Sequence, residues 1–114
     1  MVKNDSWTGS VNCNSGFVLT IRFYKVSNLV FGTFDFATQA GKTIPPWKWV
    51  NICPAGTIPV NFRPKSSNKD MIIALQGVGA GKVGFNTDGS IDMKCFDTFQ
   101  SQHEGGMQVI YLVD

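Results

Sequence analysis

Apolar and polar residues alternate most regularly between Phe17 and Phe36, and this alternation predicts a β-hairpin around which the rest of the chain packs. On its first strand, every second residue from Phe17 to Phe23 is large and apolar, so one face of the strand belongs to the core. The residues between them are more polar, so we expect the other face to be wetter or to contact another chain. They are Val18, Thr20, Arg22 and Tyr24. Residues 25–28 form a short turn, and on the return strand either alternation of residues 29–36 can face the core.

Shorter apolar segments on both sides of this hairpin predict additional strands. We expect strands at residues 7–13, 47–53, 71–76 and 107–114, a second hairpin at residues 82–93, and loops at residues 37–46, 54–64, 77–81 and 96–106. Trp47 and Trp49 would share one face of their strand, and the unbroken apolar run at 71–76 is typical of a strand buried on both faces. The proline-rich segment 54–64 would cross from one sheet to the other. Gly89 can adopt the positive φ that the turn of the second hairpin requires.

The composition favours strands over helices. Glycine and phenylalanine are abundant, with 12 and nine residues, whereas glutamate and leucine, which helices use heavily, number only one and four. About seven to eight strands without crossover helices predict an all-β fold, an antiparallel Greek-key β-barrel or sandwich. A chain of 114 residues holds one hydrophobic core, so we expect a single domain over residues 7–114, with residues 1–6 as a linker or chain end.

Net charge and hydropathy narrow the range of partners. The formal charge is only +2 and the basic residues are scattered along the chain, so nucleic acid is not an expected partner. No apolar run approaches the roughly 20 residues that span a bilayer, and the N-terminus lacks the apolar core of a signal peptide. We therefore expect a chain without membrane insertion that is made in a cytoplasm, unless a leader has been removed.

The cysteines, Cys13, Cys53 and Cys95, are odd in number, and none of them forms a C-x-x-C pair. Their wide spacing does not match a zinc ribbon. We expect three reduced, buried thiols that pack as small apolar side chains. One disulfide with one remaining thiol is the alternative.

The sequence lacks the residue sets that catalysis requires. His103 is the single histidine, so any nucleophile and base arrangement must use it. Cys95 and Asp97 lie close to it in sequence, but no nucleophile signature flanks the cysteine. Asp88 and Asp92 flank a predicted turn, where carboxylates are usually solvated rather than paired as in a glycosidase. We therefore expect no enzyme, no metal site and no cofactor.

Recognition of a ligand by an exposed surface is the remaining class of function. Saccharide sites on β scaffolds combine an aromatic platform with planar polar groups, because sugar rings offer apolar C–H faces and hydroxyl edges. The loop around His103 is the main candidate, with an ordinary solvated loop as the alternative. Trp47 and Trp49 could stack on sugars, or they could belong to the core or to a subunit interface. The candidate saccharide-binding residues are Gln76, Lys82, Trp49, Phe96, Asp97, Gln102, His103 and Glu104.

The order of these segments resembles the C-terminal head domain of receptor-binding proteins from lactococcal tailed phages. The resemblance is carried by Ser-Trp-Thr-Gly at residues 6–9, by residues 16–22, by Gly32, by the proline-rich segment 58–64, by the hairpin 83–91 and by the ending 111–114. Segments similar to 59–64, followed by an Asp-Gly hairpin, also occur in other phage baseplate and tail-fibre tips. Residues 77–99 align with the family only with gaps, so the saccharide-binding residues of the family are not carried over to this chain.

The resemblance implies a homotrimer of β-barrel heads at the tail tip of a virion, which binds a saccharide of the host cell wall before DNA injection. A trimer would cover apolar residues that one small barrel cannot bury, such as Tyr24, Phe31, Trp47 and Tyr111. The chain would then be a fragment, joined to other baseplate proteins through an N-terminal region. Two alternatives stand beside this non-catalytic adhesion: a structural baseplate or virion-decoration protein without a saccharide site, and an enzyme that degrades wall polymer.

Overall fold

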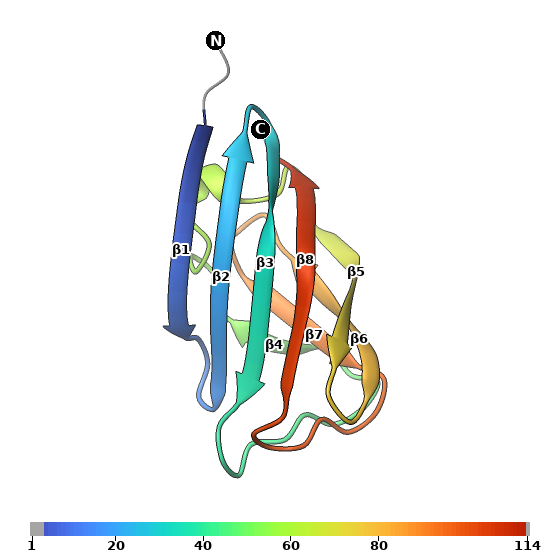
Figure 1. Ribbon diagram of the computed structural model, residues 1–114. Helices are drawn as coiled ribbons and strands as arrows, with labels where there is room; N and C mark the ends of the chain where they lie inside the picture. The colour runs from blue at the N-terminus through green and yellow to red at the C-terminus, as the bar shows by residue number, and fades with distance from the viewer. Residues whose placement is uncertain (1–3, 114) are drawn as a thin grey trace.

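Eight antiparallel strands form one strongly curled sheet in the computed structural model, which describes residues 4–113 (Figure 1). The strands are β1 (Asn4–Asn12), β2 (Phe17–Val26), β3 (Leu29–Thr38), β4 (Val50–Cys53), β5 (Asn68–Leu75), β6 (Gly79–Phe85), β7 (Ile91–Cys95) and β8 (Glu104–Leu112). Their order in the sheet is β1-β2-β3-β8-β5-β6-β7-β4. The predicted all-β antiparallel fold is confirmed.

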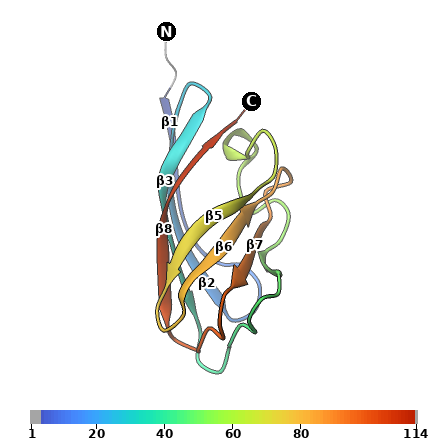
Figure 2. The same cartoon turned by 90° about the vertical axis from the view of Figure 1, so that its right-hand side faces the viewer.

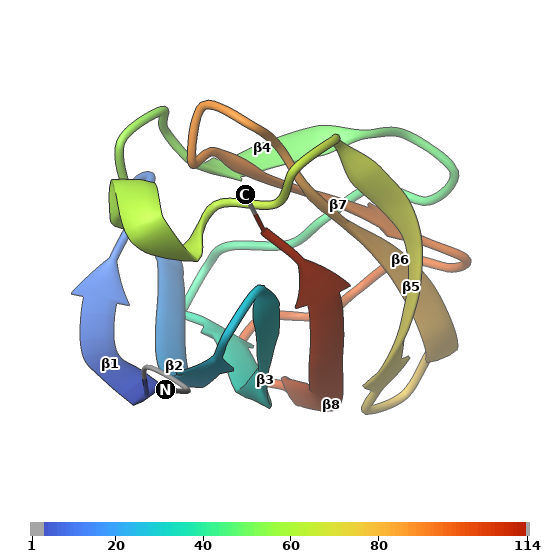
Figure 3. The ribbon, with the colours of Figure 1, turned by 90° about the horizontal axis from the view of Figure 1, so that it is seen from above.

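The last four strands have the connectivity of a Greek key. β5, β6 and β7 follow one another as hairpins, and β8 returns through a long loop to pair with β5. The resulting spatial order, β8-β5-β6-β7, is the one that defines the motif. Seen from above, the sheet curls into an incomplete barrel, with β7 and β4 across the interior from β2 and β3 (Figure 3). Residues 54–67, which include a 3₁₀ turn at Val60–Phe62, cross the end of this barrel from β4 to β5.

The hairpin of β2 and β3 forms as the alternation predicts. Phe17, Leu19, Ile21 and Phe23 are buried, whereas the alternate residues of β2 are exposed or half-buried. On β3, where either alternation was possible, Val30, Phe34 and Phe36 are buried in the core and Phe31 lies on the outer face. The turn is formed by Ser27 and Asn28, and Leu19 is paired with Phe36 across the two strands. Core and outer faces of the sheet therefore follow from the hydrophobic pattern.

An aromatic cluster connects the two sides of the barrel. Phe85 on β6 packs against Phe23 on β2, Phe34 on β3 and Tyr111 on β8, with ring centroids 5.6–6.1 Å apart. Tyr111 is only 6% exposed, and its hydroxyl donates a hydrogen bond to the carbonyl oxygen of Phe62. The expectation that Tyr111 is available for a subunit contact is therefore wrong, because this tyrosine faces the core.

The segment before β4 differs from the prediction. β4 begins at Val50 rather than at residue 47, and Trp47 lies in a turn with φ of +58°. Pro45 and Pro46 precede this turn, and prolines cannot continue a ladder, so the chain makes only isolated bridges there. Trp47 and Trp49 are 64% and 36% exposed. They do not share one face of a strand, and neither belongs to the core.

Three further expectations are corrected. β5 is buried on one face only: Ile73 and Leu75 face the core, while Ile72 is 56% exposed. The glycine-rich segment 77–81 ends the strand before it, as expected, but it is not a loop throughout: residues 76–78 form a tight turn and β6 starts at Gly79. Residues 4–6, expected in a linker, form the first part of β1, and the rest of that expected linker lies outside the described residues.

Within residues 4–113, no helix has the length and apolar character needed to span a bilayer.

Candidate functional site

A polar groove lies on the outer face of the sheet where β2, β3, β8 and β5 end or begin. Two adjoining hollows of about 320 and 590 Å³ share Asp35, Glu104 and Gly105 as lining residues. The first extends to Thr20 on β2, and the second to Gln76 in the turn after β5. We call this surface the Asp35–Glu104 groove. Its lining residues come from the start of β2 and β8 and the end of β3 and β5. These strand ends lie at the end of the barrel opposite the start of β1 and the end of β8 (Figure 1).

Glycines at the start of β8 create the floor of the groove. Gly106 is paired with Asp35, and a Cβ atom at Gly106 would lie 3.0 Å from Asp35 Oδ1. Gly105 faces the opposite way, where a Cβ atom would lie 2.5 Å from Leu75 Cδ2 and 2.8 Å from the carbonyl oxygen of Ala74. The close approach of β8 to β5 therefore requires glycine at Gly105, and β8 contributes no side chain to the outer face at Gly106.

The groove presents several hydrogen-bond acceptors. Asp35 and Glu104 are exposed, and their carboxylates can accept hydrogen bonds. The Gln76 side-chain oxygen accepts a hydrogen bond from the Glu104 N–H at 3.1 Å, which fixes the amide at the rim. Gln76 N–H in turn donates to the Glu104 carbonyl at 2.9 Å. These bonds hold the two ends of β5 and β8 together, so the polar groups of the groove lie on a rigid support.

Four of the eight predicted saccharide-binding residues come together here. Gln76 and Glu104 line the groove, and His103 Nδ1 lies 3.3 Å from the Gln76 carbonyl oxygen. Gln102 precedes them in a left-handed backbone conformation, with φ of +63°, and its N–H donates to the hydroxyl and carbonyl oxygens of Thr38. The loop around His103 is therefore tied to β3 and to the β5–β6 turn.

The other four predicted residues lie on a different surface, on the outer faces of β6 and β7 and the loops that follow β3 and β7. Phe96 stacks on Trp47, and Asp97 is its neighbour in sequence. The ammonium groups of Lys69 and Lys94 each lie over the Trp49 ring, 5.6 Å from a ring centroid. Lys82 is paired with Lys94 across the strands and forms a salt bridge with Asp70 at 3.7 Å. The eight residues thus form two groups rather than one site.

Sequence reasoning missed the residues that build the groove itself, namely Thr20, Asp35, Gly105 and Gly106. One signal was available, because Asp35 is the only charged residue in the apolar segment 29–38. A carboxylate in such a strand marks an outward position with a role other than packing. Its proximity to the glycines of β8 could not be read from the sequence, since it depends on β8 pairing with β3.

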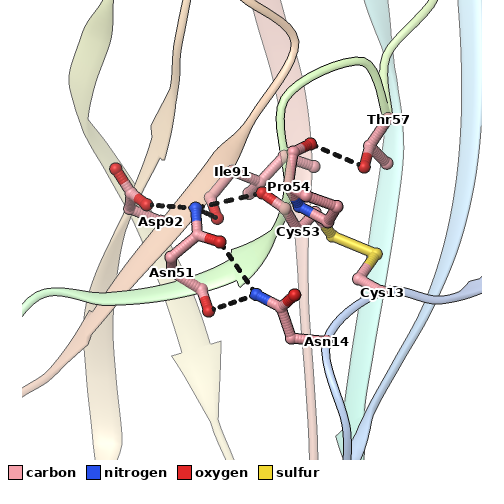
Figure 4. The surroundings of a disulfide bond; sticks show 8 residues. All are labelled: Cys13, Asn14, Asn51, Cys53, Pro54, Thr57, Ile91 and Asp92. Atoms are coloured by element: carbon pink, nitrogen blue, oxygen red, sulfur yellow. Dashed lines mark hydrogen bonds between the residues drawn. A yellow bond between two sulfur atoms is a disulfide. The ribbon is translucent and has the colours of Figure 1, made fainter.

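The prediction for the cysteines is wrong. Cys13 and Cys53 form a disulfide (Figure 4). Cys95 is free and buried. The alternative of one disulfide with one remaining thiol is the one that the structure supports. Burial raises the pKa of the Cys95 thiol to about 11, so this thiol is protonated at neutral pH. The pairing joins cysteines 40 residues apart, and their proximity depends on the curl of the sheet.

This disulfide joins the end of β1 to the end of β4, the two edge strands of the sheet. Asn14 reinforces the connection: its backbone N–H donates to the Ile52 carbonyl at 2.9 Å, and its side-chain amide donates to Asn51 O and Oδ1, both at 2.8 Å. The Asn51 amide donates in turn to Asp92 Oδ1 on β7 at 2.9 Å (Figure 4). The barrel is therefore closed by a covalent bond and amide hydrogen bonds where a strand ladder would otherwise lie.

The geometry is that of a shallow polar groove on a cross-linked β-barrel. Among residues 4–113, no group of three or more His, Cys, Asp and Glu side chains gathers as a metal site would require. Comparison of the chain with protein-family models and with curated protein sequences finds no match. The chemistry of the surface itself is therefore the basis for any functional conclusion.

Proposed function

We propose that this chain is a host-adhesion module, the head domain of a phage receptor-binding protein that binds a saccharide of the host cell wall without catalysis. The observation that carries the proposal is the Asp35–Glu104 groove. Its carboxylates can accept hydrogen bonds from sugar hydroxyls, and its glycine floor lets a sugar ring approach the backbone. Its larger hollow, about 590 Å³, is in the size range of small-ligand sites.

The position of the groove supports adhesion. β1 begins and β8 ends at one end of the barrel, and the groove lies toward the other (Figure 1). A neighbouring domain joined at either end of the chain would leave the groove accessible. This arrangement suits a domain that is attached to other baseplate proteins through an N-terminal region and that presents its far end to a cell surface.

The outer face of the same sheet supports assembly into the homotrimer that the resemblance implies. Tyr24 and Phe31 stack with ring centroids 5.8 Å apart, and Phe31 is paired with Ile110 on β8. These three side chains and Leu112 are between 38% and 62% exposed. A contiguous apolar patch of this kind on a small protein marks an interaction surface. The disulfide is compatible with a virion surface, which is an oxidising environment.

Binding to purified wall polysaccharide tests the groove. We expect Asp35→Asn and Glu104→Gln each to lower the affinity at least tenfold, because each removes a negative charge and replaces one acceptor oxygen by an NH₂ donor at nearly constant size. Asp70→Asn is the matched control, since Asp70 is an exposed carboxylate outside the groove. Single-site affinities between millimolar and micromolar are expected, with three sites adding avidity. Isothermal titration, with thermal unfolding as the check on folding, measures the effect. Unchanged affinity in both groove variants contradicts the proposal.

The structural baseplate or virion-decoration role remains the alternative, and the apolar face of Tyr24, Phe31, Ile110 and Leu112 is the observation that favours it. This alternative predicts a stable trimer that binds no wall fraction from any sensitive host. The same binding samples also test the non-catalytic part of the proposal. Steady release of reducing ends from wall polymer, lost in Glu104→Gln, would show that the groove hydrolyses its ligand.

A further inference from the structure

Trp47 is the most exposed of the aromatic side chains, with 64% of its surface open to solvent. Its ring is stacked on Phe96, with centroids 4.8 Å apart and planes inclined by only 11°. Phe96 follows the last residue of β7 and is partly buried. The phenyl ring therefore fixes the orientation of the indole, while the other face of the indole is left to solvent.

The backbone at Trp47 has a conformation that is unfavourable for a bulky side chain. Its φ of +58° lies in the left-handed region, which glycine and asparagine adopt readily and bulky residues rarely adopt. The conformation is held from outside: Trp47 N–H donates to the Cys95 carbonyl at 2.7 Å, and Pro46 is bridged to Cys95 on β7. A strained, exposed tryptophan contributes little to the core, which points to a role in binding.

The surroundings of this ring suit a sugar better than a protein. A single indole face matches one pyranose ring, whose axial C–H groups stack on aromatic surfaces. A protein partner needs roughly 800 Å² of surface on each side, far more than one indole offers. Asp97 adjoins Phe96 and is exposed, and its Oδ1 accepts a hydrogen bond from the Thr98 N–H at 2.7 Å. That bond orients the carboxylate, whose second oxygen can accept a further hydrogen bond.

We propose that Trp47 and Phe96 form a second saccharide site, a stacking platform for one sugar ring that is separate from the Asp35–Glu104 groove. This inference rests on the proposed function and adds a second contact for the same polymer. The loops that carry the two rings, after β3 and after β7, are paired through Ile44 and Phe99 and run together at the end opposite the start of β1 (Figure 2). A polysaccharide lying across this end can contact both sites.

Replacing the tryptophan separates binding from folding. Because Trp47 has a left-handed backbone, Trp47→Gly and Trp47→Asn relieve strain, and we expect both to unfold at the same temperature as the wild type or higher. Both should lower the affinity for wall polysaccharide at least fivefold, whereas Trp47→Phe keeps a stacking ring and should retain most of it. Ser27→Gly is the matched control, since it relieves a left-handed residue in the β2–β3 turn and leaves the platform intact.

Two measurements decide the outcome. Titration of ¹⁵N-labelled protein with wall oligosaccharides should shift the indole N–H resonance of Trp47 and leave that of Trp7 unchanged. Loss of binding in Asp35→Asn together with full binding in Trp47→Gly overturns the platform and leaves the proposed function standing. Absence of binding by the wild-type protein overturns both. Dissociation of the oligomer in Trp47→Gly, measured by light scattering, assigns the ring to a contact between copies and also overturns the platform.

Discussion

The two halves of the barrel are held together by different means. β1, β2, β3 and β8 are nine or ten residues long and pair in continuous register from end to end. β5, β6, β7 and β4 have four to eight residues, and the β4–β7 and β5–β6 pairs contain register shifts. We call β1, β2, β3 and β8 the long half and β5, β6, β7 and β4 the short half. Uninterrupted strand pairing holds the long half together, whereas the disulfide and the Asn14 hydrogen bonds supplement the interrupted pairing of the short half.

The junction between the halves explains why a groove exists where it does. β5 pairs with β8 at only two positions, Ala74 with Gly106 and Leu75 with Gly105, and the strands diverge beyond them (Figure 2). The side chains of the aromatic cluster fill the widening gap on the inside. On the outside, the missing side chain of Gly106 leaves a depression beside Asp35. The candidate site is thus a consequence of joining long and short strands within one sheet.

The largest expected effect comes from removing the disulfide. Replacing Cys13 and Cys53 by serine frees a loop of 40 residues, and the chain-entropy argument gives a loss of about 4 kcal/mol in the free energy of unfolding. For a domain of this size the midpoint of thermal unfolding should fall by roughly 10–20 °C. Urea unfolding monitored by tryptophan fluorescence measures the loss, and the wild type under reducing conditions should match the double variant.

Hydrogen exchange locates the effect of that change. In the variant, amides of β4 should exchange much faster, while those of β2 and β3 should follow global unfolding only. Cys95→Ala is the control, because it removes the buried thiol and keeps the disulfide. Equal protection of β4 in the variant and the wild type would mean that the short half does not need its covalent link.

A smaller effect is expected from the amide that accompanies the disulfide. Asn14→Ala removes two hydrogen bonds, to Asn51 O and Oδ1, and should cost about 1 kcal/mol. The same substitution in the disulfide-free background tests whether the two links act together. We expect a coupling energy of about 0.5 kcal/mol or more, since both tie the β1–β2 turn to β4. Additive losses would show that the amide and the disulfide stabilise β4 independently.

The long half could be predicted from the sequence, and the reason is local. Period-two alternation in residues 17–36 fixes which side chains face the core, and the hairpin pairs strands that are adjacent in the chain. The Asn-Thr-Asp-Gly turn at residues 86–89 was predictable for the same reason, since Gly89 has φ of +84°. In such segments the information that selects the structure lies within a few residues.

What the sequence did not reveal depends on distant segments. The disulfide needs β1 and β4 to meet at the edges of the curled sheet, and the groove needs β8 beside β3. The alternation of Trp47 with Trp49 predicts that Trp47 belongs to a strand. Its left-handed backbone conformation instead accompanies the bridge between Pro46 and Cys95, which is distant in sequence. Half of the predicted saccharide residues reach one surface because the loop at residues 102–104 is tied to the β5–β6 turn, which local patterns do not encode.

The smallest expected effect concerns the β6–β7 turn and its dependence on pH. The Asp88 carboxylate accepts hydrogen bonds from the Ser90 hydroxyl at 2.6 Å and the Ser90 N–H at 2.9 Å, and these bonds lower the pKa of Asp88 below its ordinary value of 3.8. Because the pKa is lower in the folded protein, the stabilisation is present above pH 3.8 and is lost as the pH falls through the folded value. Asp88→Asn should therefore show a flatter decline of stability below about pH 4, and Ser90→Ala an intermediate one. Urea midpoints measured at pH values between 2.5 and 6 check this. If the wild type and Asp88→Asn lose stability in parallel, the hydrogen bonds to the ionised Asp88 carboxylate do not contribute to the stability of the folded protein.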